Sequence, residues 1–508
     1  MTGFRPDSTR PVALADLATA LGAPNPGVDV LITGVTLDSR AVQPGDLYAA
    51  LPGANVHGGR FIAGAAAAGA VAALTDAAGA DLAHAADVQL PLLIVEDPRS
   101  RLGEAASLIY ANRDPGLSLI GITGTNGKTT TAYLLDSALR ALGQRTGLVG
   151  TVETRIGERR IKSVRTTPEA SEVHGLIAAM REGGVDTCVM EVSSHALSLH
   201  RVDGLVYDVA VFTNLSQDHL DHHRTMDNYF LAKAALFTPQ RARQGVICVD
   251  DAWGQRLAAD APIPVTTLSS TGQPADWRLD AGEGSEFTLT GPAGRLDLRS
   301  ALPGDFNRVN TALAALTLLA AGHGIDAVRE AVLADPHVPG RMEKVTANTP
   351  REPAPLAVVD YAHTPDAVAA ALAALRPEAA PGGLIVVLGA GGDRDRSKRE
   401  AMGAAAALGA DQVFVTDDNP RSEDPATIRA AVLSGARAAG AESRIEEVPD
   451  RAEAIAAAVE AAYAAGPGSV IAVVGKGHES GQDIAGVIHP FDDRTELAAA
   501  LDAAGGSA

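Results

Sequence analysis

The strongest constraint on this chain is a short glycine-rich segment, GITGTNGKTT at residues 121–130, which joins an apolar run to an amphipathic run. The apolar run at residues 117–122 predicts a buried strand, and residues 131–142 predict a helix. Small residues at such a junction let consecutive backbone N–H groups turn toward a phosphate, and the helix N-terminus adds positive potential. The segment therefore predicts a phosphate-binding loop.

This loop is a variant of the common pattern G-x-x-x-x-G-K-[ST], which would require glycine where Ile122 stands. Lys128 supplies a point charge, and the Thr129 hydroxyl is a candidate magnesium ligand. A glycine-rich turn that merely contains a lysine is the plain alternative. The pattern favours a nucleotide triphosphate enzyme, with these residues at the nucleotide: Gly124, Thr125, Asn126, Gly127, Lys128, Thr129 and Thr130.

Length and composition predict an α/β protein of several domains. The 508 residues correspond to about three domains at roughly 150 residues each. Apolar residues make up 46% of the chain but aromatic residues only 4%, so the cores must be built from Ala, Val, Leu and Ile, as in sheets covered by alanine-rich helices. The net charge of −20 argues against nucleic acid or anionic lipid as a partner.

The two cysteines, Cys188 and Cys248, are too few to stabilise a chain of this size by disulfide bonds, and their spacing is not that of metal ligands. Both observations fit a reducing compartment. The N-terminal residues lack an apolar signal region, and the alanine-rich run at 63–73 is too short and too weakly apolar to span a bilayer. We expect a soluble cytoplasmic protein that does not contact the membrane and is a monomer.

Strand and helix patterns divide the chain into three stretches. Residues 1–114 predict a small α/β substrate-binding domain, with strands at 28–37, 47–51 and 92–95 and helices at 60–73 and 100–110. Residues 115–339 predict a central parallel-sheet ATPase domain that carries the variant loop. Residues 340–508 predict a C-terminal Rossmann-like domain, with strands at 356–359, 384–388, 412–416 and 469–474.

Two polar side chains of the central stretch, Glu191 and His219, are candidate metal ligands. Glu191 follows the strand TCVMEV, where a second magnesium ligand is needed beside Thr129. Among the histidines of DHLDHH, we expect His219 to bind a hard cation; a zinc cluster is the alternative, but it lacks a completing ligand motif. Lys233 lies on an apolar helix, a pattern that by itself favours a side chain extended to solvent.

Five further residues are candidates for nucleotide contact. Asn307 and Asn310 begin an Ala/Leu helix, where Asn307 is either a helix cap or a purine contact. Arg341, at the junction with the third stretch, is either an arginine finger or a hinge ion pair. Asp360 and His363 follow a strand in VVDYAHTPDA.

Three loops of the third stretch carry a second set of charges. Each follows a different strand, so we expect them to converge on one crevice. Guanidinium groups pair with carboxylates and acids pair with ammonium, so this set suits a zwitterionic ligand. The candidate residues are Arg394, Asp418, Asn419, Pro420, Arg421, Gly475 and Glu479.

Ten ordered motifs give the chain a specific family resemblance that covers nearly its whole length. It resembles the Mur ligases of peptidoglycan synthesis. The motifs are TGTNGKTT, EVSSHAL, TNLSQDHLDHH, YFLAKAALF, LPGDFNRVN, PGRME, DYAHTPDA, GGDRDRSKR, DNPRSEDP and GKGHE.

The resemblance implies an ATP-dependent amide ligase that activates its substrate as an acyl phosphate. It implies ATP and Mg²⁺ at Lys128, Thr129, Glu191 and His219, a carbamate on Lys233, and ATP contacts from Asn310, Arg341 and Asp360. It implies meso-diaminopimelate at the crevice of the third domain. It also implies that UDP-N-acetylmuramoyl-L-alanyl-D-glutamate is held by Ser39, Thr166, Thr167, Ser193 and Arg201.

Two positions depart from many relatives, which have Gln where Leu199 stands and Asn where Arg165 stands, so contacts to the muramoyl peptide are expected to differ there. Asp360 or His363 is the candidate that accepts the proton of the attacking amine. Three alternatives remain: the same ligase acting on L-ornithine or L-lysine, a folylpolyglutamate synthase, and a non-enzymatic ATP switch or cell-wall scaffold.

Overall fold

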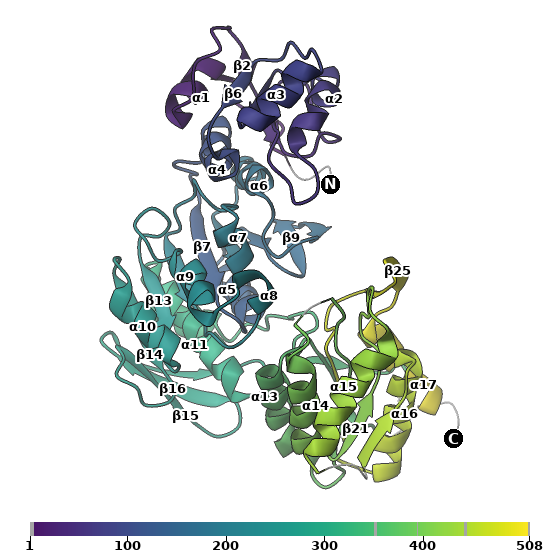
Figure 1. Ribbon diagram of the computed structural model, residues 1–508. Helices are drawn as coiled ribbons and strands as arrows, with labels where there is room; N and C mark the ends of the chain where they lie inside the picture. The colour runs from purple at the N-terminus through teal and green to yellow at the C-terminus, as the bar shows by residue number, and fades with distance from the viewer. Residues whose placement is uncertain (1–4, 350–352, 394, 441–443, 506–508) are drawn as a thin grey trace.

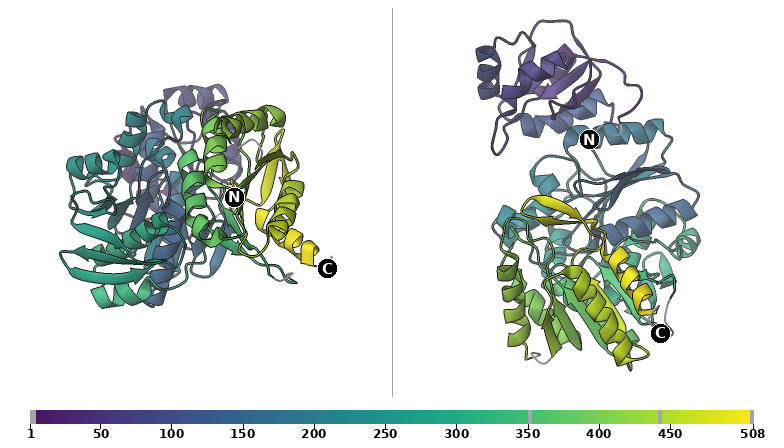
Figure 2. Two further views of the ribbon diagram at one scale, coloured as in Figure 1. Left: turned by 90° about the horizontal axis from the view of Figure 1, so that it is seen from below. Right: turned by 90° about the vertical axis from the view of Figure 1, so that its right-hand side faces the viewer.

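The chain folds into three α/β units arranged in sequence order, as a computed structural model describes for residues 5–349, 353–393, 395–440 and 444–505. The first unit lies at the top of Figure 1, the central unit below it, and the third beside the lower part of the central one. Figure 2 shows the same order from two further directions. None of the helices in these described ranges is long and apolar enough to cross a membrane.

The first unit is built on a parallel sheet in the order β3-β4-β5-β6, with a two-stranded β1-β2 ladder beside it. Its strands are β1 (Val12–Ala13), β2 (Leu31–Ile32), β3 (Gly34–Thr36), β4 (Asp46–Ala49), β5 (Ala72–Thr75) and β6 (Leu92–Ile94). Its helices are α1 (Leu14–Leu21), η1 (Gly58–Phe61), α2 (Ile62–Ala67), α3 (Ala77–Ala85) and α4 (Pro98–Ile109). The helix predicted over 60–73 is wrong at its C-terminal end, because residues 72 and 73 belong to β5.

The central unit holds an eleven-stranded sheet in the order β10-β9-β8-β11-β7-β12-β13-β14-β15-β16-β17. The strands from β8 to β15 are parallel, and the two outer pairs at each edge are antiparallel. They are β7 (Ser118–Thr123), β8 (Thr146–Val149), β9 (Glu153–Ile156), β10 (Arg159–Lys162), β11 (Thr187–Glu191), β12 (Val209–Phe212), β13 (Gly245–Cys248), β14 (Val265–Ser269), β15 (Trp277–Ala281), β16 (Glu286–Gly291) and β17 (Gly294–Arg299).

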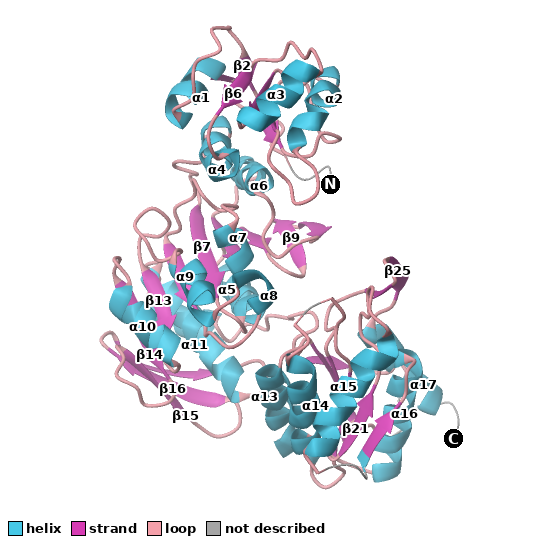
Figure 3. Cartoon of the chain, in the orientation of Figure 1, coloured by secondary structure: helices cyan, strands magenta, loops and turns pink. Residues whose placement is uncertain are grey.

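Helices cover both faces of this sheet (Figure 3), which explains why its middle strands are apolar on both sides. On one face lie α5 (Lys128–Ala141), α11 (Asp305–Ala320) and α12 (Ile325–Ala331). On the other lie α6 (Ala170–Glu182), α7 (Ser194–Ser198), α9 (Met226–Ala234) and α10 (Ala252–Asp260), with the short α8 (Leu220–His223) before α9.

The third unit is a six-stranded sheet in the order β18-β19-β23-β20-β21-β22, parallel except for β18. Its strands are β18 (Glu343–Val345), β19 (Leu356–Asp360), β20 (Leu384–Leu388), β21 (Gln412–Val415), β22 (Ile445–Glu447) and β23 (Val470–Val474), followed by the hairpin β24 (Gly481–Ile484) and β25 (Val487–Pro490). Its helices are α13 (Pro365–Leu375), η2 (Arg376–Ala379), α14 (Lys398–Gly409), α15 (Pro425–Ala438), α16 (Arg451–Ala465) and α17 (Asp493–Gly505).

Candidate functional site

The phosphate loop occupies residues 124–127, between the end of β7 and the start of α5. Gly124 and Gly127 have φ angles of 149° and 86°, and a Cβ on Gly124 would collide with the Thr213 hydroxyl. The loop is fixed by the residues after β12: the Asn214 carbonyl accepts the N–H of Thr125 at 2.9 Å, and its side-chain oxygen accepts the N–H of Asn126 at 3.0 Å. The predicted strand–loop–helix junction is present, and its glycines are required by its geometry.

Lys128 and Thr129 begin helix α5 directly after the loop. The Lys128 ammonium donates to the carbonyls of Gly124 and Thr125, each at 2.9 Å, and burial lowers its pKa. The Thr129 hydroxyl donates to the Glu191 carboxylate at 2.9 Å, and Thr130 is buried in the same turn. The carboxylate and the hydroxyl are hard oxygen donors of the kind that Mg²⁺ takes beside substrate phosphates.

Glu191 is itself held from the strand β8 side by a residue that the motif pattern did not single out. Thr151 donates to the Glu191 carboxylate through its N–H at 2.8 Å and its hydroxyl at 3.0 Å. These bonds orient a buried carboxylate toward the loop. No sequence signal distinguishes a buried threonine in a turn from a solvent-exposed one. This contact could therefore be identified only in the folded structure.

His219 stands beside the loop, immediately before α8, with a φ of 54°. Burial lowers its pKa to about 3, and its ring lies 3.6 Å from Asp218 and edge-on to His195 at 4.9 Å between centroids. The rings of His222 and His223 also pack here. Within the described part of the chain, no three His, Cys, Asp or Glu side chains are grouped to hold a metal by themselves, so the zinc-cluster alternative has no ligand set.

Lys233 is buried beneath the phosphate loop and is only 1% exposed. Its ammonium donates to the Gly124 carbonyl at 2.7 Å and lies over the Tyr229 ring, 4.6 Å from the centroid. The extended, solvated side chain that the helical pattern favoured is wrong: the helix turns this position toward the loop. Burial holds the pKa of Lys233 well below its usual range, which favours the unprotonated amine more than at an exposed lysine.

Helix α11 brings Asn307 and Asn310 against the loop. The helix is capped by Gly304, and the Asn307 amide donates to the Pro303 carbonyl at 2.7 Å, so Asn307 is not the cap. Asn310 donates to Asn307 at 3.1 Å and accepts a hydrogen bond from Thr131 at 3.4 Å. A Cβ on Gly127 would lie 2.5 Å from the Asn310 oxygen, so only glycine fits between this helix and the loop.

The third unit contributes Arg341, Asp360 and His363 to the same place. Arg341 donates to the Thr129 hydroxyl at 3.3 Å and stacks on the Tyr361 ring at 4.3 Å. Asp360 accepts backbone N–H bonds from Met342 and Ala362, and burial raises its pKa. The Nδ1 of His363 lies 2.8 Å from the Tyr361 carbonyl, so in the neutral ring Nδ1 carries the hydrogen and Nε2 the lone pair. Burial lowers the pKa of His363 to about 4.

A cavity of about 570 Å³ joins these elements. Its wall includes the loop, Glu191, His219, both asparagines, Arg341, Asp360 and His363. The central and third units therefore share one polar cavity at the carboxyl ends of their parallel strands, the usual ligand position in such sheets.

The residues expected to hold the nucleotide-sugar substrate divide between two cavities. Ser39 lines a cavity of about 880 Å³ between the first and central units, whereas Thr166 and Ser193 line the smaller one. Thr167 donates to the Glu191 carbonyl at 2.8 Å, and Arg201 pairs with Glu169 at 2.8 Å, a residue of the larger cavity. The set is thus spread along a path between the two cavities.

The two departures from the family pattern lie in different places. Arg165 lines the larger cavity and approaches Glu169 at 3.6 Å, where Arg99 also pairs at 3.4 Å. Leu199 follows helix α7 and belongs to the wall of neither of these two cavities. Arg165 therefore adds a cation to the wall of the larger cavity.

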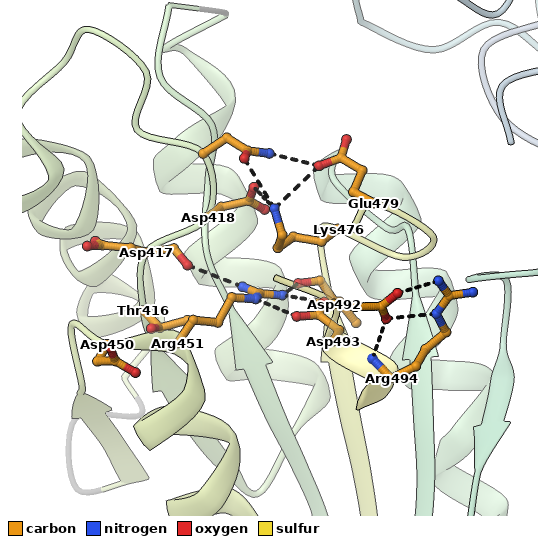
Figure 4. Close-up of polar contacts among 12 residues, drawn as sticks. Thr416, Asp417, Asp418, Asp450, Arg451, Lys476, Glu479, Asp492, Asp493 and Arg494 are labelled. Atoms are coloured by element: carbon orange, nitrogen blue, oxygen red, sulfur yellow. Dashed lines mark hydrogen bonds and ion pairs between the residues drawn. The ribbon is translucent and has the colours of Figure 1, made fainter. Parts of the chain in front are cut away.

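The second charged set follows the ends of β21 and β23, and Figure 4 shows two of its members, Asp418 and Glu479. Asn419 donates to Glu479 at 2.8 Å, and Gly475, at a φ of 115°, lies against Asp418. Pro420 is buried, and Arg421, at a φ of 52°, donates to the Gly392 carbonyl. Arg394 lies outside the described residues. The loops after β21 and β23 converge as expected.

Lys476 is a member of this set that the motif reading missed. It is fully buried between Asp418, Asn419 and Glu479. It stands inside the GKGHE motif, but a lysine between glycines is equally typical of a solvated loop. Only the partner loop, which ends 57 residues earlier at Asn419, shows that the side chain points inward.

Models of one family match three consecutive segments. Residues 31–110 match "Mur ligase family, catalytic domain", residues 122–318 match "Mur ligase middle domain", and residues 340–477 match "Mur ligase, glutamate ligase domain". The matches include the loop, the central asparagines and the third-unit residues from Arg341 to Lys476, whereas Glu479 lies just beyond the last matched segment.

Relatives match over nearly the full length. A UDP-N-acetylmuramoyl-L-alanyl-D-glutamate–2,6-diaminopimelate ligase of Streptomyces avermitilis is 53% identical, with 98% of each chain covered. A UDP-N-acetylmuramyl-tripeptide synthetase of Leifsonia xyli subsp. xyli is 49% identical over 99% of this chain and 100% of the relative. A solved structure of a UDP-N-acetylmuramoyl-L-alanyl-D-glutamate–2,6-diaminopimelate ligase is 33% identical, with a TM-score of 0.66, and covers 97% of this chain and 99% of that chain.

Proposed function

The chain belongs to the Mur ligase family, and from that premise we propose that it joins meso-diaminopimelate to the D-glutamyl γ-carboxylate of UDP-N-acetylmuramoyl-L-alanyl-D-glutamate, using ATP. The reaction belongs to the synthesis of the peptidoglycan precursor. It takes place in the cytoplasm, on a monomer whose domains span residues 1–114, 115–339 and 340–508.

The observation that carries this proposal is the cavity shared by the phosphate loop and the third unit. Arg341 reaches Thr129 across the boundary between the units, while Glu191 and Lys128 approach from the central sheet. Two anions, the substrate carboxylate and the γ-phosphate, must meet for the reaction to start. Cations arranged in a partly dry cavity stabilise that encounter far more than water does.

The chemistry has two steps. A carboxylate oxygen attacks the γ-phosphorus, the bond to ADP breaks, and an acyl phosphate forms. The amine nitrogen of the diamino acid then attacks the acyl carbon, phosphate leaves with the carbon–oxygen bond electrons, and the nitrogen loses a proton. Lys128 and Arg341 balance the developing charge, and the Ser39-to-Ser193 path orients the carboxylate toward the loop.

Mg²⁺, when bound, would neutralise part of the negative charge of the triphosphate. Thr129, Glu191 and His219 would hold it, and the paired hydroxyl and carboxylate support this assignment. Burial lowers the pKa of Lys233 and so favours the unprotonated amine, the form to which CO₂ adds, and we propose that this side chain carries a carbamate with anionic oxygens near the loop.

The diamino acid would bind at the loops after β21 and β23. Arg421 and Arg394 would pair with the distal carboxylate, and Asp418, Asn419, Pro420, Gly475 and Glu479 would form the rest of the pocket. L-lysine and L-ornithine lack that carboxylate. A charged hydrogen bond contributes about 1.5 to 3 kcal/mol, so we expect at least roughly tenfold preference for meso-diaminopimelate.

The test is an amino-acid panel with the purified chain, ATP, Mg²⁺ and the UDP-muramoyl dipeptide. ADP release and the mass of the product are measured with meso-diaminopimelate, L-lysine and L-ornithine. Equal or better turnover with L-lysine or L-ornithine would show that the diamino acid is misassigned. A ligated product only with a folate substrate and glutamate would favour a folylpolyglutamate synthase, and no product with any amine would favour the ATP switch.

A further inference from the structure

A buried lysine stands at the centre of the acid–lysine cluster, which we define as Asp418, Asn419, Lys476 and Glu479. The Lys476 ammonium lies 3.2 Å from the Asn419 side-chain oxygen, 3.5 Å from Glu479 and 3.9 Å from Asp418, and donates to the Gly481 carbonyl at 2.7 Å. Figure 4 shows it between Asp418 and Glu479. The Lys476 side chain is 0% exposed, so its ammonium is not hydrated by bulk water.

Lys476 fixes which way the Asn419 amide points. The Asn419 oxygen accepts from Lys476 and from the Asp483 N–H at 2.9 Å. The NH₂ group must therefore turn outward, where it donates to Glu479 at 2.8 Å. With two donors converging on its oxygen, the amide cannot be flipped without placing NH₂ against an ammonium and an N–H group.

Lys476 also sets the charge of the cluster. Two carboxylates and one ammonium leave a single negative charge, which complements one ammonium group of an amino-acid ligand. Without Lys476, Asp418 and Glu479 would lose the ammonium that lies between them, and their like charges would repel each other. The cluster would then lose its defined charge and Glu479 its orientation.

The main chain behind the cluster is held by a second buried pair (Figure 4). Arg451 pairs with Asp493 at 2.7 Å, with both side chains 0% exposed. The same guanidinium donates to the Val474 carbonyl at 3.0 Å and the Asp417 carbonyl at 3.4 Å, the residues that precede Gly475 and Asp418. The backbone of both loops is therefore fixed, so that Lys476 acts on side chains within a rigid frame.

We propose that Lys476 is a positioning residue for the amino-acid pocket, which orients Asn419 and Glu479 and sets the pocket to a single negative charge. The inference rests on the proposed function, since it concerns the site assigned there to the diamino acid. Lys476 would not touch the reacting atoms and would act only through its neighbours.

Steady-state kinetics on Lys476→Met test this inference, with each of the three substrates varied in turn. We expect the KM for meso-diaminopimelate to rise about tenfold or more, while the KM values for ATP and the UDP-muramoyl dipeptide stay within about twofold. Lys344→Met, an exposed lysine on β18 of the same unit, is the matched control and should leave all three KM values unchanged. A general loss of structure would instead raise all of them or lower the melting temperature.

A double-mutant cycle with Glu479→Gln separates positioning from simple packing. If Lys476 acts by orienting and neutralising Glu479, adding Lys476→Met to Glu479→Gln should raise the KM for the diamino acid by less than about threefold further. If instead the two substitutions raised this KM independently, so that the KM of the double variant rose by the product of the two single factors, the inference would be overturned. If Lys476→Met does not fold, Lys476→Gln, which keeps a donor but no charge, replaces it in the same cycle.

The outcomes distinguish this inference from the function on which it rests. A wild-type chain that ligates meso-diaminopimelate, with a Lys476→Met variant of unchanged KM for it, contradicts the role of Lys476 alone. A folded wild-type chain that ligates no amine at all contradicts the proposed function and this inference with it.

Discussion

The guanidinium of Arg341 lies 3.3 Å from the hydroxyl of Thr129, although 212 residues separate them in the chain. This contact connects the third unit to the first turn of the helix behind the phosphate loop. It places a planar cation where the charge of a transferring phosphoryl group would develop.

Replacing Arg341 by Ala should lower kcat by about 100-fold or more, because stabilisation by such an arginine is absent from the ground state and present in the transition state. Arg341→Lys keeps the charge without the fork and should recover only part of the rate. The rate of ADP release with all substrates saturating measures the effect. Arg295→Ala, an exposed arginine on β17, serves as control, and equal rates for the two alanine variants would contradict the assignment.

The buried amine of Lys233 should take up CO₂. Burial holds its pKa well below the usual range, so more of the amine is unprotonated than at an exposed lysine, and CO₂ adds to that form; the carbamate should therefore be lost as the pH falls. A ¹³C NMR signal from labelled bicarbonate should appear in the wild type and in Lys344→Met, and should be absent from Lys233→Met together with the activity. Full activity of the wild type in bicarbonate-free buffer would count against a carbamate.

Gly475→Ala should raise the KM for the diamino acid about tenfold, because the added Cβ would stand 2.6 Å from an Asp418 carboxylate oxygen and displace it. Gly466→Ala is a matched control with a φ of 93° and no neighbouring atom within 4 Å. Both variants bear the strain of a positive φ, so a difference in KM between them isolates the contact with Asp418. The same KM in both would mean that Asp418 does not contact the amine.

Arg421 should determine the preference for a ligand with a distal carboxylate. Arg421→Asn removes the guanidinium and suits the φ of 52°, a conformation that asparagine tolerates. The ratio of kcat/KM for meso-diaminopimelate to that for L-lysine should fall by about tenfold or more, mainly through the diaminopimelate value. An unchanged ratio would assign the selectivity to another residue.

His174 should make the protein less stable in mild acid. Its buried ring accepts from the Asn112 amide at 3.2 Å and has its other nitrogen 2.9 Å from the Asp203 carbonyl, so both nitrogens are used by the neutral form. Burial lowers its pKa to about 4 from 6.5. The unfolded chain therefore binds a proton that the folded chain does not as the pH falls through this window.

Between about pH 6.5 and pH 4, this single group should lower the free energy of unfolding by up to about 3 kcal/mol. Urea unfolding across that range measures it. His174→Gln should flatten the dependence, and His489→Gln, at an exposed position, should leave it unchanged. Identical slopes in all three proteins would assign the acid sensitivity to other groups.

The doubly wound third unit could be predicted from its sequence because its buried parallel strands are continuous apolar runs followed by glycine or acid. The predicted strands at 356–359, 384–388, 412–416 and 469–474 match β19, β20, β21 and β23 to within one residue at either end. The strands of the first unit were harder to predict from the sequence. Its strand β5 is the alanine-rich AALT, buried throughout, and such a run has no alternation and only one β-branched residue, Thr75, to distinguish a strand from a helix.

The phosphate loop and its neighbours could be predicted because their chemistry is local. The burial of Lys233 could not be predicted from its helical pattern, since its partner, the Gly124 carbonyl, is 109 residues earlier in the chain. Lys476 was missed for the same reason. A short motif gives the residue type, whereas the direction of its side chain depends on another loop that only the fold brings near.

The pairing of Arg451 with Asp493 ties the frame of the acid–lysine cluster to the last helix of the described chain. Asp493 follows every residue of that cluster in the sequence, so a ribosome synthesises the cluster before the carboxylate that pairs with Arg451. A chain that ended before α17 would therefore lack this ion pair, although the residues of the cluster would all be present.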